Sequence, residues 1–521
     1  MATARALFYG SALYHLALSW PAPETLALHL KARWPGVAAR GEDMLAGRFA
    51  FAGETVESAL PPWDAPRSDA WRAWLHGFSW LADLASLGGE PAARAAREWT
   101  DDWVRRYTVY DQFTWRADVL SDRLFAWLEQ FERMGGGLVA SFARQARHLA
   151  RVAGREGEGV ARLNGVRGLV TVQAALGGKR RVADALQRLE HEIAVQFWPD
   201  GGHRARSPKA QLAALRCLVD ARASLQAAGE SVPDALLRAI ERVGLMVRFF
   251  RHGDGGFALF NGADEGDAAL IDLVLARADA RGRAPLTAPD TGFERLQAGG
   301  TVALFDCGEP AAPGFDRDAH AGALSFEMSH GAERIIVNCG ASAAEPWRAA
   351  LRATAAHSTA IVADTNSAEI RADGTLGQAP RGAKQKRVEH EGDLLVAATH
   401  DGYRANFGLT HARQLFLAAD GDDLRGEDML TGTAGSGFAI RFHLHPAVDP
   451  ALQPGASAVS LKLPSGARWR FAAEGAVLSL GESIYAGSGA PVRTQQILLD
   501  GHVGTHGARV RWALKREGKA A

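Results

Sequence analysis

The segment Asp318-Ala-His320-Ala-Gly-Ala-Leu-Ser-Phe-Glu places polar side chains just before a β-like apolar run. It is followed by Ile335-Ile-Val-Asn338-Cys-Gly, a second β-like run that ends on an amide, and then by Ala-His357-Ser-Thr. Because each segment supplies one polar side chain, we expect His320, Asn338 and His357 to converge in one cluster. Side chains of these types can coordinate a metal ion or hydrogen-bond to a sugar.

The first half of the chain has a helical hydrophobic period. Trp71 and Trp74 begin an apolar stripe on one face of an amphipathic helix. Ser207-Pro208 predicts an N-cap followed by proline at the first helical position. Ser231-Val-Pro233 predicts the start of another helix. Successive helical hairpins are therefore expected, and their period does not distinguish a bundle from a solenoid or a ring of paired helices.

The period changes to two beyond the prolines of Ala284-Pro-Leu-Thr-Ala-Pro289. Residues 438–442, Phe-Ala-Ile-Arg-Phe, alternate as in a strand with one buried face. Many short strands separated by turn signals predict an antiparallel β-sandwich. The sequence therefore predicts an α+β multidomain protein, with a helical domain at 1–285 and a sandwich domain at 286–521.

Composition narrows the class of protein. Lys+Arg and Asp+Glu both total 59, so no global charge attracts nucleic acid. No apolar run reaches the roughly 18 residues of a membrane span, and the N-terminal stretch reads as a first helix rather than a secretory signal. The three cysteines, Cys217, Cys307 and Cys339, lie far apart, which favours buried free thiols.

The quoted segments resemble the C-terminal domain of the heparinase II/III-like family of polysaccharide lyases. Trp115-Arg-Ala-Asp-Val-Leu-Ser-Asp-Arg123 and Trp198-Pro-Asp-Gly-Gly-His203-Arg-Ala-Arg-Ser-Pro208 are similar to its helix and loop motifs. The resemblance implies an incomplete α/α toroid followed by a β-sandwich. It also implies β-elimination of an acidic, uronic-acid polysaccharide or oligosaccharide, and a place in the cell envelope or periplasm, or in the cytoplasm if the N-terminus is no signal.

Elimination requires that the sugar carboxylate be neutralised, that a base remove the neighbouring proton, and that an acid protonate the leaving oxygen. Asn164 matches the family's neutralising Asn, while its Asn-Gly pair is also a common turn. His203 lies in a loop with Arg206, where a base and a carboxylate-binding guanidinium would be close together. Ala210 occupies the place of the family's Tyr.

Two further positions depart from the family pattern. His320 matches a metal-site residue, and Asp318 stands where the family has its catalytic His, so Asp318 is the candidate base there. Asn338 replaces a carboxylate, which disfavours zinc although His357 is retained. We therefore expect a hydrogen-bonded cluster of His320, Asn338 and His357 that requires no cofactor, with a divalent metal such as zinc as the alternative.

Two rival functions remain open at the level of sequence. A glycoside hydrolase could use paired carboxylates on a helical toroid, with candidates Asp101, Asp102 and Asp111. A catalytically silent envelope protein could bind glycan in the same fold. Other histidines could also replace missing groups: His400-Asp-Gly-Tyr403 reads as a site or a hairpin turn, and His443 with His445 as a chelating pair or a solvated face.

Overall fold

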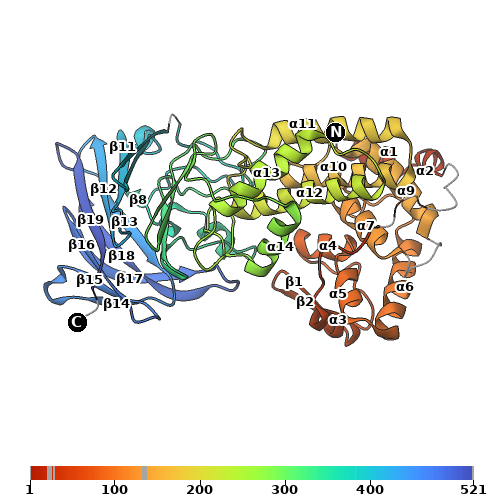
Figure 1. The fold of residues 1–521 in the computed structure, drawn as a ribbon, viewed down its shortest axis with the longest axis horizontal. Coiled ribbons are helices and arrows are strands. Elements are labelled where there is room, and N and C mark those ends of the chain that lie inside the picture. The colour runs from red at the N-terminus through yellow and green to blue at the C-terminus, as the bar shows by residue number, and fades with distance from the viewer. Residues whose placement is uncertain are drawn as a thin grey trace. The chain divides into compact units, whose positions relative to one another are not determined.

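The computed structural model describes residues 2–19, 26, 28, 30–131, 138–381 and 383–518. The chain forms two compact units (Figure 1). The first unit comprises Met1–Gln196 and Arg216–Ile240, and the second comprises Phe197–Leu215 and Glu241–Ala521. The predicted order of helices followed by antiparallel strands is confirmed.

In its described residues, the regular elements of the first unit are helices and one hairpin of β1 (Arg48–Phe51) and β2 (Glu54–Glu57). Its helices are α1 (Ala2–Tyr9), α2 (Ala12–Leu18), α3 (Ala38–Leu45), α4 (Asp69–His76), α5 (Leu81–Leu87), α6 (Gly89–Arg106), α7 (Ala117–Glu129), α9 (Val139–Val152), α10 (Gly159–Leu176) and α11 (Lys179–Gln196). Helix α10 packs closely on α7, because a Cβ at Gly168 would lie 2.3 Å from the Ser121 Oγ.

Two helices run across the division between the units. α12 (Pro208–Ala227) begins at the predicted proline, and the Ala210 backbone N donates to the Ser207 Oγ at 3.4 Å. α13 (Asp234–Phe249) begins directly after Pro233, as expected. Both predicted helix starts are confirmed.

Tryptophans fill the core of the first unit. Trp103, Trp115 and Trp127 are fully buried, and the Arg123 guanidinium carbon lies 4.2 Å from the centre of the Trp103 ring. Arg123 donates to the Gln145 Oε1 and to two backbone carbonyl oxygens, while burial lowers its pKa to about 9. The Trp-Arg motif that suggested the family thus forms part of the helical core.

The second unit contains α14 (Ala268–Ala278) and two antiparallel sheets. One sheet has the order β14-β15-β16-β19-β12-β11-β10-β9. Its strands are β14 (Asp449–Leu452), β15 (Val459–Lys462), β16 (Arg468–Glu474), β19 (Ala508–Arg516), β12 (Asp423–Gly432), β11 (Leu409–Leu417), β10 (Asp393–His400) and β9 (Lys384–His390).

The other sheet has the order β17-β18-β13-β7-β6-β5-β4-β3, with β8 paired to β13. Its strands are β17 (Val477–Tyr485), β18 (Val492–His502), β13 (Gly437–Leu444), β7 (Glu333–Val337), β6 (Phe326–His330), β5 (Thr301–Asp306), β4 (Phe293–Ala298), β3 (Thr287–Ala288) and β8 (Ala360–Val362). The alternation predicted around Phe438 and Phe442 is confirmed in β13.

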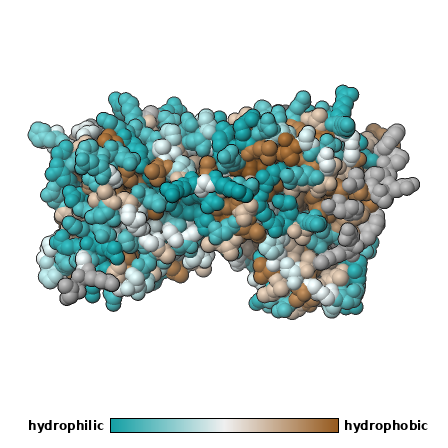
Figure 2. Space-filling view, in the orientation of Figure 1, coloured by the Kyte–Doolittle hydropathy of each residue, from teal (hydrophilic) through white to brown (hydrophobic). Residues whose placement is uncertain are grey.

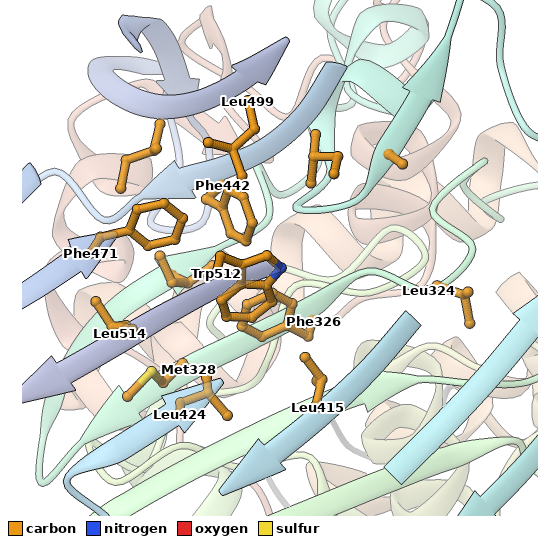
Figure 3. Close-up of a cluster of buried hydrophobic side chains, with 14 of the residues drawn as sticks. Leu324, Phe326, Met328, Leu415, Leu424, Phe442, Phe471, Leu499, Trp512 and Leu514 are labelled. Atoms are coloured by element: carbon orange, nitrogen blue, oxygen red, sulfur yellow. The ribbon is translucent and has the colours of Figure 1, made fainter. Parts of the chain in front are cut away.

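The core of the second unit is an aromatic and aliphatic cluster that both sheets supply (Figure 3). The Phe326 ring stacks on Trp512, with centroids 5.4 Å apart and an interplanar angle of 9°. Phe442 meets the same indole edge-on at 4.9 Å. These contacts join strands β6, β13 and β19, so the sandwich closes around residues nearly 190 positions apart in sequence.

Tertiary contacts divide the chain into its two units at other positions than residue 285, near which the hydrophobic period changes from helical to β-like. Residues 197–215 and 241–285 pack with the sandwich although much of this stretch is helical. The reason is that their polar groups bond to strand residues, as when Arg295 in β4 donates to the Phe249 carbonyl oxygen at 2.8 Å. The change of hydrophobic period shows where the strands begin, whereas tertiary contacts show which segments belong to the same compact unit.

Hydrophilic residues cover most of the molecular face in Figure 2, and hydrophobic ones form smaller patches. Within the described residues, no helix is both long enough and apolar enough to cross a membrane. The N-terminal stretch forms the short helices α1 and α2, as the sequence predicted for this segment.

Candidate functional site

The His203 loop, residues 197–207, is held in place by Asp200 and Gln211. Asp200 accepts hydrogen bonds from the backbone N and Oγ1 of Thr291 at 2.7 and 2.6 Å. The Gln211 Oε1 accepts from the His203 backbone N at 2.7 Å, and its Nε2 donates to the carbonyl oxygens of Gly201 and Val243. Gln211 is therefore a structural residue that holds the loop in place.

The His203 ring is buried, with 1% of the residue exposed. It packs against Phe197 and Phe315, and its Nδ1 accepts a hydrogen bond from the Ala205 backbone N at 3.1 Å. Burial lowers the pKa of His203 to about 3. A ring with this pKa is neutral and weakly basic at neutral pH, so it is poorly matched to proton transfer.

Arg206 is bound inside the second unit. Its Nε donates to the Thr291 carbonyl oxygen at 2.8 Å, and its Nη2 donates to the Asp306 Oδ1 at 2.5 Å and the Gly292 carbonyl oxygen at 3.0 Å. Both members of the ion pair are buried, with side-chain exposures of 6% and 7%. This guanidinium anchors the His203 loop to the sandwich, which leaves it poorly placed to bind a substrate carboxylate.

Asn261 joins the His203 loop to the His320 segment. Its Nδ2 donates to the Arg206 carbonyl oxygen at 2.9 Å, and its Oδ1 accepts from the His320 backbone N at 3.0 Å. Asn261 has a positive φ of 47° and precedes Gly262. No motif in the sequence singled out Asn261, although the Asn-Gly pair that it forms is a recognisable turn signal.

His320 and His357 form a chain of hydrogen bonds. The His357 Nδ1 lies 2.8 Å from the Ala353 carbonyl oxygen and must donate to it, so its Nε2 accepts from the His320 Nδ1 at 2.9 Å. The His320 Nε2 then accepts from the Gly262 backbone N at 3.0 Å. Burial lowers the pKa of both rings, to about 4 for His357. All four ring nitrogens are occupied while both imidazoles are neutral.

Asn338 lies next to this pair but bonds to the backbone. Its Oδ1 accepts from the Ser358 backbone N at 3.0 Å, and its own backbone N donates to the Glu327 Oε1 at 2.9 Å. The expected contact between His320 and His357 is present, whereas Asn338 reaches the cluster through Ser358. Among the described residues, no group of three His, Cys, Asp or Glu side chains is arranged to hold a metal. With its ring nitrogens already bonded, the trio does not fit zinc in this arrangement.

Asp318 is exposed on the surface, and within the described part of the chain it makes no hydrogen bond or ion pair with the His320 ring. Its side chain is 78% exposed, and its Oδ1 lies 3.8 Å from the Arg348 Nη2. It stands beside the Asn261 turn, because a Cβ at Gly262 would lie 2.9 Å from the Asp318 Cβ. No buried group encloses the Asp318 carboxylate among the contacts described, so this arrangement does not hold it against the His320 ring.

Asn164 belongs to the first unit, in helix α10. Its Nδ2 donates to the Asp122 Oδ1 at 3.0 Å, and its Oδ1 accepts from the Arg167 Nη2 at 2.5 Å and Nε at 3.1 Å. The Ser121 Oγ donates to the Asn164 carbonyl oxygen at 2.5 Å. The amide is thus part of a helix-to-helix network and is not the turn that its Asn-Gly pair suggested.

A buried Glu–His–Ser network holds the 252–259 loop to strand β6, and sequence analysis missed it. The His252 Nε2 lies 3.0 Å from the Glu327 Oε2, and its Nδ1 lies 2.9 Å from the Ser329 Oγ. The Glu327 Oε1 also accepts from the Leu259 backbone N at 3.0 Å, while burial raises the pKa of Glu327 to about 7. The local sign of this network in the sequence is that two polar residues, Glu327 and Ser329, stand at alternate positions of a strand.

The carboxylates proposed for a hydrolase have local structural roles. Asp102 accepts from the Trp63 Nε1 at 2.9 Å and pairs with Arg106 at 2.8 Å. Asp111 accepts from the backbone N of Thr114 at 2.7 Å, and Asp101 is exposed on α6. These contacts explain why the three carboxylates stand where they do, and none of them joins two of the carboxylates into a catalytic pair.

His400 and His443 have structural roles, while His445 is 24% exposed with its Nε2 3.7 Å from the Glu265 Oε1. The His400 Nε2 lies 3.2 Å from the His411 Nδ1, and the Tyr403 hydroxyl donates to a backbone oxygen at 2.8 Å. The expectation that His443 is solvated is wrong, because it is 2% exposed and its Nδ1 lies 2.7 Å from the Ser483 Oγ. Its partners come from β17, which is not adjacent to β13, and from Cys339 and the Ala355 carbonyl oxygen, and alternation within one strand does not reveal such contacts.

Comparison with known proteins places the chain in a family. Residues 280–513 match the heparinase II/III-like C-terminal domain. FtsZ-localized protein C of Caulobacter vibrioides (strain NA1000 / CB15N) is 32% identical over 543 residues, which cover 98% of this chain and 94% of that protein. The chain belongs to the heparinase II/III-like family, as the sequence motifs predicted.

Solved structures share the fold. The crystal structure of heparinase III superposes with a TM-score of 0.76 at 15% identity, covering 99% of this chain and 90% of that one. The heparan sulfate lyase HepC from Pedobacter heparinus gives a TM-score of 0.64 at 17% identity, covering 100% and 89%. At these identities the likeness shows the fold alone, and it confirms the predicted fold class.

Proposed function

We propose that this protein binds an acidic polysaccharide on a lyase fold without cleaving it by β-elimination. One observation carries the proposal: the positions that the family resemblance assigns to proton transfer hold no group prepared for it. Ala210 has no phenol, the His203 ring is buried and its Nδ1 is already bonded, and the Asp318 side chain is 78% exposed. This supports the silent binder over the lyase.

The requirements of elimination support the same conclusion. A general base works best when its pKa lies near the working pH. Burial holds the pKa of His203 at about 3 and that of His357 at about 4. The Arg206 guanidinium, which would have neutralised the sugar carboxylate, is paired with Asp306. Binding demands none of these proton transfers, so it remains compatible with every contact described.

Exposed polar groups around the Asn261 turn supply a surface for a sugar. The Lys209 Nζ lies 2.7 Å from the Asp264 Oδ2, with side-chain exposures of 62% and 39%. Arg348 stands beside Asp318 in the same part of the second unit, and its side chain is 46% exposed. Arginine can hold a carboxylate through two parallel hydrogen bonds, which suits a uronic acid.

Incubation with a panel of uronic-acid polymers tests the proposal, with an active lyase as positive control. We expect retained polymer binding and no new chain ends. Conjugated, ultraviolet-absorbing ends would overturn the proposal in favour of β-elimination, and reducing ends without that absorbance would favour a hydrolase. The Arg348→Ala variant should weaken binding, while Arg493→Ala, at an exposed position on β18, serves as the matched control.

The relative described as FtsZ-localized favours a second function, association with FtsZ polymers at the cell-division site. Identity of 32% over nearly the whole of both chains supports a shared location. Co-sedimentation with FtsZ filaments assembled in GTP should bring the protein into the pellet. Recovery in the supernatant at every filament concentration would count against this function and leave glycan binding to be judged separately.

A further inference from the structure

A pocket with a cavity volume of about 720 Å³ lies within the second unit. It is formed by the end of α13, the turns near 253 and 282, and strand β4. Four arginines line it: Arg248, Arg251, Arg283 and Arg295. The volume falls in the range of small-molecule sites, which is roughly 300–1,000 Å³.

Arg295 is the buried member of this set, with 7% of the residue exposed. Its Nε donates to the Gln297 Oε1 at 3.0 Å, and its Nη1 donates to the carbonyl oxygens of Phe249 and Arg251, both at 2.8 Å. Among the described residues, no carboxylate forms an ion pair with it. Burial lowers its pKa to about 10, so it is still a cation at neutral pH. A buried charge with only neutral partners is costly, so this position favours the binding of an anion.

The other three arginines of the pocket add positive charge, and the Asp272 carboxylate balances only one of them. Arg251 pairs with Asp272 at 2.7 Å, and that carboxylate is 65% exposed. Arg248 donates from Nη2 to the Ala280 carbonyl oxygen at 3.1 Å, and its buried Nε has no partner within the described part of the chain. Arg283 is exposed, and none of the described carboxylates pairs with it.

A structural role explains part of this arrangement. The Phe249 carbonyl oxygen ends helix α13, and a cation near a helix C-terminus is favourable. That role accounts for the place of Arg295, but it leaves the Arg248 Nε, the unpaired Arg283 and the open volume unexplained. Gly255 and Gly282 line the pocket and have no side chains to fill it, and their positive φ values of 85° and 133° favour glycine at these turns.

We propose that this pocket binds a tetrahedral oxyanion, the phosphate or sulfate group of a small ligand, through Arg248, Arg283 and Arg295. Guanidinium groups match such oxyanions with paired N–H donors. The cavity is larger than one anion, which leaves room for the organic part of a phosphate or sulfate ester. The site uses none of the residues invoked for glycan binding, so it stands or falls separately from that function.

Isothermal titration of the full chain with inorganic phosphate, pyrophosphate and sulfate tests the site. We expect one saturable site, weakened at least about tenfold in Arg283→Ala, since a charge-assisted contact is lost. Arg281→Ala is the matched control, because Arg281 is two residues away, is 88% exposed and pairs with Asp279. Urea midpoints of both variants should equal that of the wild type.

The affinities for a sugar phosphate and for a sugar sulfate are then compared. The ester that binds more tightly shows whether the site prefers phosphate or sulfate. Arg248→Gln provides an independent second variant, which should also weaken pyrophosphate binding by about tenfold. The proposal is overturned if none of the three inorganic anions binds at millimolar concentration, or if Arg281→Ala weakens binding as much as Arg283→Ala does.

Discussion

Replacing His320 by Ala removes the centre of the imidazole chain. In the wild type the ring donates to the His357 Nε2 and accepts from the Gly262 backbone N. The variant leaves a buried acceptor and a backbone donor without partners, and a cavity where the ring was. His357 keeps its own bond to the Ala353 carbonyl oxygen, so it is unable to compensate by turning toward Gly262.

The expected cost follows from those two contacts. Each unsatisfied buried group costs about 1–3 kcal/mol, so we expect the free energy of unfolding to fall by about 2–5 kcal/mol. The double variant with His357→Ala should lose less than the sum of the single variants, with a coupling of about 1 kcal/mol. Additive losses would show that the two rings do not interact as described.

The same cluster predicts how stability depends on pH. Burial holds the folded-state pKa of His357 at about 4, below its unfolded value of 6.5. Between these values the unfolded chain binds more protons, so the stabilisation is complete above pH 6.5 and is lost as the pH falls toward 4. Each such ring contributes a slope of up to about 1.4 kcal/mol per pH unit in that window. His320→Ala should therefore flatten the acid limb.

Urea unfolding of the full chain, followed by tryptophan fluorescence, measures both effects. His506→Ala, at an exposed position, is the control and should change the midpoint little. A chelator should leave the wild type unchanged. The reasoning is refuted if His320→Ala lies within about 0.5 kcal/mol of the wild type, or if chelation destabilises the wild type and not the variant, which would restore a metal site.

Three further outcomes are expected. Gln211→Ala should lower the free energy of unfolding by about 2–4 kcal/mol, because three buried backbone groups lose their partner, and exposed Gln226→Ala should be neutral in the same urea titration. Asp428→Asn should cost about 3–5 kcal/mol, since the buried Arg413 guanidinium loses its counter-charge; an unchanged midpoint would contradict this. Native Cys339 should resist alkylation by iodoacetamide, because burial raises the pKa of its thiol to about 12, and rapid labelling detected by mass spectrometry would disprove it.

Patterns local in the sequence predicted the fold. The change of period near 285 separated helices from strands, the Ser207-Pro208 pair located the start of α12, and alternation located β13. The Trp-Arg motif and the His320 segment predicted the family. These features succeed because helix and strand periods are set by neighbours within a few positions.

The candidate site depended on contacts that no local pattern encodes. The sequence suggested that Arg206 binds substrate, but in the structure its guanidinium is neutralised by Asp306, 100 positions later. His203 reads as a loop base until Phe197 and Phe315 are seen to bury its ring.

What the sequence determined by itself was the type and order of elements and the family to which they belong. What only the tertiary structure decided was which polar groups are already bonded and which remain open to a ligand. Asn261 shows the reason, since its amide joins the Arg206 carbonyl oxygen to the His320 backbone N. The availability of a side chain depends on its burial and its partners, and both are set by segments that meet only when the chain folds.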